Sequence, residues 1–413
     1  MSIIKKQNIY LPKKDTDYSK WSVIACDQFT SEPKYWDELK SFVGDAPSTL
    51  NLTIPEIYLP ATDEMINKVN YNMTHLFLHG GFESIGESMV LVNRSTSLHP
   101  KRLGIMLNVD LDAYDFRPDA HAMIRATEGT IIERIPPRLK IRKDAPLEFP
   151  HIMLLYDDRK EKIAETLYQN RCDMECLYDF DLNMGGGHIQ GWRIDNPDKI
   201  IEKFETLITK EYLQNTFGVD EALMFAVGDG NHSLATAKAH WDSIKESLSQ
   251  EERESHPARY ALVEAVNIHD EGIEFEPIYR VMKNVGADFM EGLKNLYNGT
   301  DYMIQQIFYD GNRTEEYKLP NNSPLAIKIV QEYIDNYLKK HPDSVVDYVH
   351  GLDNLRNICL AEGQGSVGLT LPTLKKEELF AFVIKYGVLP RKSFSIGEGF
   401  EKRYYLEAHK IVK

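Results

Sequence analysis

Apolar residues recur along the chain with the spacings of both strands and helices. Alternating or continuous apolar runs bounded by polar or turn-forming residues predict strands. These runs lie at 87–95, 102–116, 152–156, 223–227, 258–269 and 344–351. Apolar residues three or four positions apart predict helices that begin near Pro33 and cover 160–169, 197–213, 323–342 and 375–387. The mixture predicts a multi-domain α/β or α+β protein with mixed sheets and helices.

Two further stretches are interpreted as strands. The segment 21–30, "WSVIACDQFT", begins like a strand. Within 129–150 we expect a strand that the pair Pro136–Pro137 interrupts, because proline removes a backbone donor.

The length of the chain sets its domain organisation. At 413 residues it exceeds one ordinary domain. We expect an N-terminal α/β unit at 1–150, a central unit at 151–285 that carries the turn discussed below, and a C-terminal α/β unit at 286–413. The first boundary falls between Pro146 and Pro150, and a site could be shared between units.

Composition and charge narrow the class of protein. A hydrophobic content of 42% supports a sizeable core, and the net charge of −15 argues against a protein that wraps duplex DNA. Four scattered cysteines are typical of reduced thiols, and two of them, Cys172 and Cys176, lack the second pair that a zinc site needs. Because no signal peptide or run of about 18 apolar residues is present, we expect a soluble cytoplasmic protein without a membrane partner.

The most informative stretch is "MFAVGDGNHSLATAKAHW", residues 224–241. A strand that ends in a glycine turn before a helix leaves backbone N–H groups free to bind an anion. Asp229 could then hold a metal or orient a hydroxyl, and His232 could bind phosphate or transfer a proton. The alternative is a plain turn in which Asp229 or Ser233 caps the helix. The turn is not a P-loop. The residues that would surround the anion are Gly228, Gly230, Asn231 and Ser233.

A second candidate is "ATEGTIIERIPPR", residues 126–138. Glu128 stands between small residues and could be a general base or a magnesium ligand. Arg134 and Arg138 could bind phosphate in the bidentate manner of guanidinium groups. The alternative is a charged loop with surface ion pairs.

Two weaker candidates complete the set. In 389–405, the basic pairs Arg391–Lys392 and Lys402–Arg403 could form an anion clamp or a solvated face. In "NMGGGHIQGW", residues 183–192, His188 could contact substrate, or the glycines could simply make a flexible connection. No G-x-S-x-G motif indicates a serine hydrolase.

Taken together, these segments resemble the domain-of-unknown-function 1015 family, often labelled ParB-like, over most of the chain. The resemblance lies in residues 124–158, 183–194, 227–241, 260–280 and 389–411. It implies no established activity. Many members read A-D-G-H-H-R at the central motif. Here Asp229, Gly230 and His232 match, whereas Asn231 replaces the first histidine and Ser233 replaces the arginine.

The central motif also resembles the strand-turn-helix core of the ParB/sulfiredoxin superfamily. Members of that superfamily bind nucleotide phosphates at the helix start and include a free-serine kinase with a D-G-H-T-R motif and a catalytic glutamate upstream. The resemblance implies a nucleotide and Mg²⁺ as cofactors, and genes neighbouring those of family members imply serine metabolism. With Ser233 in place of the arginine, a basic residue such as Arg134, Arg138, Arg391 or Arg403 would have to replace it.

These observations predict a small-molecule phosphoryl-transfer or phosphate-ester enzyme, a phosphotransferase or phosphatase, with serine or phosphoserine as the leading substrate. A nucleotide or metabolite sensor without catalysis is the alternative, and the acidic charge disfavours a DNA-partition protein. The expected catalytic residues are Glu128, Asp229 and His232. The expected ligand-binding residues are Gly228, Gly230, Asn231, Ser233, Arg134, Arg138, His188, Arg391 and Lys392.

Overall fold

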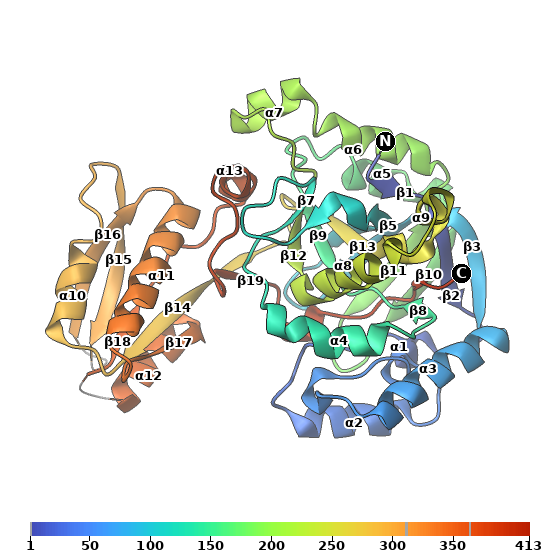
Figure 1. Ribbon diagram of the computed structural model, residues 1–413, viewed down its shortest axis with the longest axis horizontal. Coiled ribbons are helices and arrows are strands. Elements are labelled where there is room, and N and C mark those ends of the chain that lie inside the picture. The colour runs from blue at the N-terminus through green and yellow to red at the C-terminus, as the bar shows by residue number, and fades with distance from the viewer. Residues whose placement is uncertain (1, 310–312, 363–364) are drawn as a thin grey trace. The chain divides into compact units, whose positions relative to one another are not determined.

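The computed structural model describes residues 2–309, 313–362 and 365–413, which form two compact units. The large unit contains Met1–Ala126, Thr130–Ile273 and Glu398–Lys413, and the small unit contains Thr127–Gly129 and Glu274–Gly397. Figure 1 shows the helices and strands of both. The protein is a mixed α/β protein, as the hydrophobic pattern predicts. No helix in these described ranges has the length and apolar character needed to cross a membrane.

The large unit is built on a mixed sheet with ten strands among the described residues. Strand β12 (Phe225–Asp229) is parallel to β7 (Ile124–Ala126) and antiparallel to β9 (Met153–Tyr156), and β9 is parallel to β13 (Tyr260–Asn267). In β5 (Arg102–Asp110), Ile105 and Leu107 pack into one apolar cluster and Met106 into another, so the sheet is buried on both faces. In order along the sheet the strands are β10 (Cys176–Asp181), β11 (His188–Arg193), β4 (Val90–Ser95), β5 (Arg102–Asp110), β13 (Tyr260–Asn267), β9 (Met153–Tyr156), β12 (Phe225–Asp229), β7 (Ile124–Ala126) and β6 (Tyr114–Asp115), with β1 (Ile4–Lys5) beside β5.

A second sheet of the large unit joins both ends of the chain. Its order is β3 (Phe82–Ser88), β2 (Gln7–Pro12), β20 (Ala408–Lys410) and β8 (Leu147–Glu148). The α-helices of this unit are α1 (Tyr18–Trp21), α2 (Pro33–Val43), α3 (Asp63–Leu78), α4 (Ile135–Arg142), α5 (Ala164–Gln169), α6 (Pro197–Thr206), α7 (Lys210–Phe217), α8 (Asn231–Lys245) and α9 (Gln250–Ser255). Short 3₁₀ turns are η1 (Thr49–Asn51), η2 (Glu56–Tyr58), η3 (Leu111–Ala113), η4 (Ile132–Arg134), η5 (Arg171–Asp173), η6 (Pro257–Arg259) and η7 (Gly399–Glu401).

The small unit has an antiparallel sheet with helices packed on it. Met282 of its central strand lies in one apolar cluster with Phe289 and Val330, whereas Val281 lies in another with Leu355. Both faces of this sheet are therefore covered too. The strand order is β16 (Arg313–Pro320), β15 (Tyr302–Tyr309), β18 (Val367–Leu369), β14 (Phe275–Lys283) and β17 (Val345–His350), and β19 (Phe394–Ile396) also pairs with β14. The helices are α10 (Ala287–Lys294), α11 (Ser323–Lys340), α12 (Leu352–Glu362) and α13 (Lys376–Tyr386).

Three local predictions are wrong, each for a physical reason. The start of 21–30 is not a strand, because Trp21 ends α1 and only Ile24 forms an isolated bridge. The pair Pro136–Pro137 does not interrupt a strand, because it occupies the first turn of α4, where no backbone donor is needed. The single helix predicted over 197–213 is two helices, because the Thr209 side chain caps a new start at α7.

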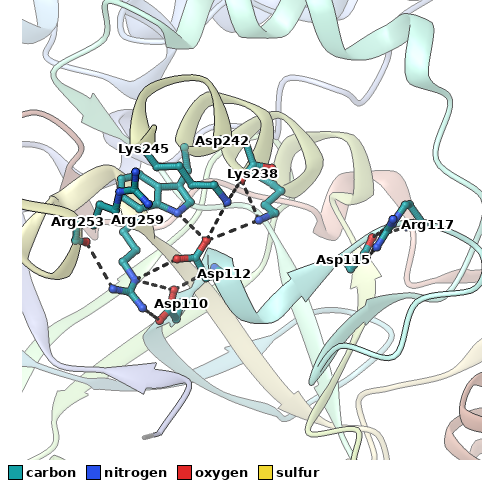
Figure 2. Close-up of polar contacts among 10 residues, drawn as sticks. Asp110, Asp112, Asp115, Arg117, Lys238, Asp242, Lys245, Arg253 and Arg259 are labelled. Atoms are coloured by element: carbon teal, nitrogen blue, oxygen red, sulfur yellow. Dashed lines mark hydrogen bonds and ion pairs between the residues drawn. The ribbon is translucent and has the colours of Figure 1, made fainter. Parts of the chain in front are cut away.

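Polar contacts in the second half of helix α8 tie it to the segment that follows β5, as Figure 2 shows. Asp112, just beyond β5, accepts hydrogen bonds from the Trp241 indole at 2.9 Å and from Lys245 at 3.2 Å. Lys238 lies 3.8 Å from the same carboxylate, and Arg259 pairs with Asp110 at 2.7 Å. Several charges acting together hold a helix better than isolated surface pairs. This network fixes the direction of α8 and therefore the position of its first residues.

Candidate functional site

The turn between β12 and α8 requires a glycine. Gly230 has φ of 79° and ψ of 26°, which is left-handed backbone. A Cβ at this position would lie 3.0 Å from both Cα and Cγ1 of Ile152 on the neighbouring segment. The Asp229 carboxylate accepts the Gly230 N–H at 2.9 Å. The turn thus brings the chain into α8 directly after the strand.

The first turn of α8 presents backbone donors without acceptors. The cap residue is Gly230, and no side chain caps the helix. Within the described residues, the N–H groups of Asn231, His232 and Ser233 have no hydrogen-bond acceptor. Asp229 and Ser233 therefore do not cap α8, contrary to that part of the alternative interpretation. Free N–H groups at the positive end of a helix form an anion-binding arrangement.

His232 is a neutral donor at this turn. Its Nε2 accepts the Ile131 N–H at 3.3 Å, so the proton of the neutral ring must lie on Nδ1. Burial, together with the positive charges of Arg138 and Arg134, lowers the pKa of His232 to about 4. At neutral pH the ring can therefore donate one hydrogen bond to a ligand through Nδ1, and it carries no charge.

The Ser233 side chain contacts His151, which lies in the segment just before strand β9. Its hydroxyl lies 2.9 Å from Nε2 of His151, which precedes β9. The His151 ring packs edge-on against Tyr404, with 5.2 Å between ring centroids. Its Nδ1 is buried and has no partner among the residues described. Antiparallel pairing of β9 with β12 brings this histidine to the start of α8.

Lys402, near the C-terminal end of the sequence, adds a positive charge beside the turn. Lys402 lies 3.1 Å from the second carboxylate oxygen of Asp229. Asp27 belongs to the same cluster. Burial acts to raise its pKa, but the His151 charge, a hydrogen bond from Gln28 and the Lys402 charge together lower it. Asp27 therefore stays ionised and favours cationic neighbours.

The arginines divide into two groups. Arg138 donates to Glu56 at 2.9 Å through Nε and to the Arg134 carbonyl at 2.6 Å. Arg134 has an exposed side chain. By contrast, Arg403 is 2% exposed, and it donates to the Asn183 side chain at 2.8 Å. Arg134 and Arg138 therefore contribute to the positive field, whereas Arg403 is committed to the interior.

The glycine-rich connection serves packing. A Cβ on Gly186 would collide with the Arg403 guanidinium, and Gly187 has φ of 81°. His188, at the start of β11, places its two ring nitrogens 2.6 Å from Asp181 and 2.7 Å from Asp179. Although burial opposes it, these two carboxylates raise the pKa of His188. Its predicted contact with substrate has no support in this arrangement and stays a prediction.

Glu128 lies in the small unit, together with Lys392. Its carboxylate accepts the N–H groups of Lys392 at 3.2 Å and Ser393 at 2.9 Å. Burial raises the pKa of Glu128, although these backbone donors act in the opposite direction. The structure thus groups Glu128 with Lys392, and neighbouring Arg391, in one unit. It groups Asp229, His232 and the α8 donors in the other, and cooperation between the two groups stays a prediction.

We expect Glu128→Gln to loosen the segment that this carboxylate holds. An amide accepts more weakly than a carboxylate, and a lost charge-assisted bond costs about 1–2 kcal/mol. Native-state hydrogen exchange should show the amides of Lys392 and Ser393 exchanging at least tenfold faster. The same substitution at the exposed Glu316 is the control and should change neither rate. Unchanged exchange in Glu128→Gln would show that the carboxylate does not hold this segment.

The sequence pattern of the family described as a protein of unknown function, DUF1015, matches residues 9–354. The chain belongs to this family. Among curated proteins, none matches the chain.

Solved structures of low similarity complete the comparison. A free serine kinase in complex with AMP has 9% identity and a TM-score of 0.37, covering 73% of this chain and 91% of its own. SbnI from Staphylococcus aureus has 11% identity and a TM-score of 0.35, covering 71% and 82%. A conserved hypothetical protein from Pyrococcus furiosus has 11% identity and a TM-score of 0.33, covering 71% and 90%. Likeness at this level assigns neither ligand nor reaction to the family member described here.

The described side chains do not form a preformed metal cage, whereas Mg²⁺ in nucleotide sites binds through one or two carboxylates and phosphate oxygens. In the described ranges, no group of three His, Cys, Asp or Glu side chains is arranged to hold a metal ion. Asp229, the predicted ligand, faces the Lys402 ammonium group. A cation would have to displace that ammonium group. The α8 donors, in contrast, suit the phosphate of a nucleotide or of another ester.

Sequence reasoning missed two members of this cluster, Asp27 and His151. Neither stands at a spacing from Asp229 or Ser233 that any motif uses. His151 is 82 residues from Ser233, and Asp27 comes from the N-terminal part of the chain. The signal for His151 is its place immediately before a buried strand, which becomes informative only once the order of strands is known.

Proposed function

We propose that this protein is an enzyme that acts on a small phosphorylated molecule, as a phosphotransferase or a phosphatase. The observation that carries the proposal is the set of N–H groups on Asn231, His232 and Ser233, which have no acceptor among the described residues and lie in a positive field. Phosphoryl transfer depends mainly on positioning and on stabilising negative charge.

The proposed phosphate cluster comprises Arg138, His151, Asp229, Asn231, His232, Ser233 and Lys402. Its members have the following chemical roles in this proposal. The three N–H groups and Nδ1–H of His232 bind phosphate oxygens. Lys402 neutralises charge, and Asp229 positions its ammonium group. The Ser233 hydroxyl and Nε2 of His151 form a hydrogen-bonded pair, 2.9 Å apart, through which a proton can move. Gly230 allows the backbone to approach the ligand closely.

Several finer points rest on the resemblance alone. Serine or phosphoserine is the leading substrate that it implies, with a nucleotide as the partner in transfer. Glu128 as general base, and Arg391 and Lys392 as anion ligands, belong to the same hypothesis. Each is tested by substitution in the assay below, because a group that acts in the transition state lowers kcat when it is removed.

The second candidate function is a metabolite sensor without turnover. One observation favours it: two of the groups expected to act in catalysis are already engaged. Asp229 is paired with Lys402, and Nε2 of His232 already accepts a backbone N–H. Such a site binds an anion but has limited acid–base capacity.

We expect Lys402→Met to weaken binding of inorganic phosphate at least tenfold, since the substitution removes the ammonium group and keeps the length of the side chain. Isothermal titration calorimetry measures the change in Kd. Lys199→Met, at an exposed position of α6, is the matched control and should leave the Kd unchanged. Wild-type protein that does not bind phosphate would overturn the proposed site.

Turnover distinguishes the enzyme from the sensor. Phosphate release from phosphoserine and transfer from ATP to serine are followed with wild-type protein and with Lys402→Met. Turnover that falls in the variant supports an enzyme. Phosphate binding without turnover of any ester in a broad panel supports the sensor.

A further inference from the structure

A cavity of about 160 Å³ lies beside the start of α8, within the large unit. Most of its wall is apolar, formed by Leu52, Ile54, Met73, Ile141, Leu147 and Leu262. The phosphate cluster contributes Arg138, His151 and Ser233 to the rest of the wall. The cavity and the proposed phosphate site therefore share residues.

Ser233 joins the two regions directly. Its backbone N–H belongs to the unbonded donors of α8, and the residue also lines the cavity. A ligand held by those donors therefore has the cavity within reach of its next atoms. The His151 ring lines the same wall, and its buried Nδ1 has no partner in the described part of the chain.

The charged groups in the wall already have partners of opposite sign. Arg138 is paired with Glu56, and Arg142 is paired with Glu148 at 2.6 Å. The ammonium and carboxylate groups of an amino-acid ester would lose water here and find only charges that are already paired, which is costly. A neutral apolar group gains from the same surroundings.

The volume sets the size of that group. An apolar cavity of about 150 Å³ holds one benzene molecule in a well-studied engineered protein. The cavity at α8 thus matches one six-membered ring or a short branched chain.

We infer that the substrate is a phosphate monoester whose ester group is compact, neutral and apolar, with its phosphate on the α8 donors and its ester group in the cavity. The inference rests on the proposed function and deepens it. It favours aryl or branched alkyl phosphates over the serine-derived esters that the family resemblance implies.

Binding of three probes to the full chain tests the inference. Calorimetry is performed with phenyl phosphate, phosphoserine and inorganic phosphate. We expect the Kd of phenyl phosphate to be at least tenfold lower than that of either other probe. Phenol, which has the ring without the phosphate, should bind the wild-type protein weakly, and its contact with the cavity should appear by NMR at Met73 or Ile141.

A substitution that fills the cavity provides a second test of the inference. Ala145 lines the wall and is 4% exposed. In Ala145→Leu the ratio of the Kd of phenyl phosphate to that of inorganic phosphate should rise at least tenfold. Ala287→Leu adds the same methyl groups at an exposed position of the small unit and should leave the ratio unchanged. Because the wild-type probes need no variant, the test holds even if Ala145→Leu fails to fold.

The outcomes separate the inference from the function on which it rests. Wild-type protein that does not bind inorganic phosphate overturns the proposed function and the inference with it. Wild-type protein that binds inorganic phosphate, but binds phenyl phosphate no more tightly than phosphoserine, overturns the inference alone. A Kd ratio that Ala145→Leu does not change also overturns it.

Discussion

Glu407→Gln is expected to raise the free energy of unfolding by about 3 kcal/mol at pH 8 and to leave it nearly unchanged at pH 4. Glu407 is fully buried, and burial raises its pKa to about 7, with the Glu264 charge acting in the same direction. One carboxylate oxygen accepts the Tyr178 hydroxyl at 2.8 Å, and the other has no partner among the described residues.

The sign of the effect follows from which state holds the proton. A folded-state pKa above the unfolded value means that the folded protein holds this proton more tightly. The stabilisation is therefore complete below the ordinary pKa of glutamate and is lost as the pH rises through about 7. Glutamine is neutral in both states, so the variant avoids this loss at high pH.

Urea denaturation at a series of pH values measures this difference for the large unit. Glu87→Gln on β3 is the control, because the residue is exposed, and its curve should follow that of the wild type. An equal gain for Glu407→Gln at pH 4 and pH 8 would show that packing, not ionisation, is responsible. An unchanged stability at pH 8 would show that Glu407 ionises at its ordinary pKa.

Gly230→Ala is expected to lower the free energy of unfolding by about 2–3 kcal/mol and to weaken phosphate binding at least tenfold. Left-handed backbone costs an alanine about 1 kcal/mol or more. The new Cβ would also lie 3.0 Å from the Cα of Ile152, so the backbone of one segment must move. That movement displaces the first N–H groups of α8 from their common direction.

Gly218→Ala separates the two contributions. Gly218 also has left-handed backbone, with φ of 67°, but a Cβ there would meet nothing within 4 Å. The free energy of unfolding of Gly218→Ala should fall only by the cost of left-handed backbone, about 1 kcal/mol. This variant should bind phosphate like the wild type. Equal losses in both variants would show that the contact with Ile152 is unimportant. Full phosphate binding by Gly230→Ala would remove the α8 turn from the proposed site.

The hydrophobic pattern predicts the central elements because local and tertiary preferences agree there. The apolar run before Gly228 and the alanine-rich segment after Ser233 are buried as a strand and a helix. The pattern fails where one residue type fits two structures. Pro136 can interrupt a strand or begin a helix, and only packing beyond the local sequence decides between them.

The residues of the candidate site likewise include some that the local sequence predicts and some that only the fold brings together. His232 and Ser233 follow from the motif, because a strand-turn-helix places its polar residues at the helix start. His151, Asp27 and the pairing of Lys402 with Asp229 depend on the order of strands and on the path of the last residues. No spacing along the sequence encodes these, since residues from distant segments meet only after the sheets have formed.

Many family members have an arginine where this chain has Ser233. In the large unit, other basic residues lie near this position. Arg403 is committed to Asn183, whereas its neighbour Lys402 reaches the turn and pairs with Asp229. Arg134 and Arg138 add positive charge near His232. We therefore propose that a lysine and two arginines together supply the charge that one arginine supplies in many family members.

The division of the large unit along the chain has a consequence for biosynthesis. The small unit is inserted between Ile273 and Glu398, and the segment that follows supplies Lys402, Tyr404 and strand β20. During translation, the first 273 residues therefore emerge without a member of the phosphate cluster and without a strand that pairs with β2. The nascent chain can therefore assemble the proposed phosphate cluster only after the ribosome has added both the small unit and the segment from Glu398 onward.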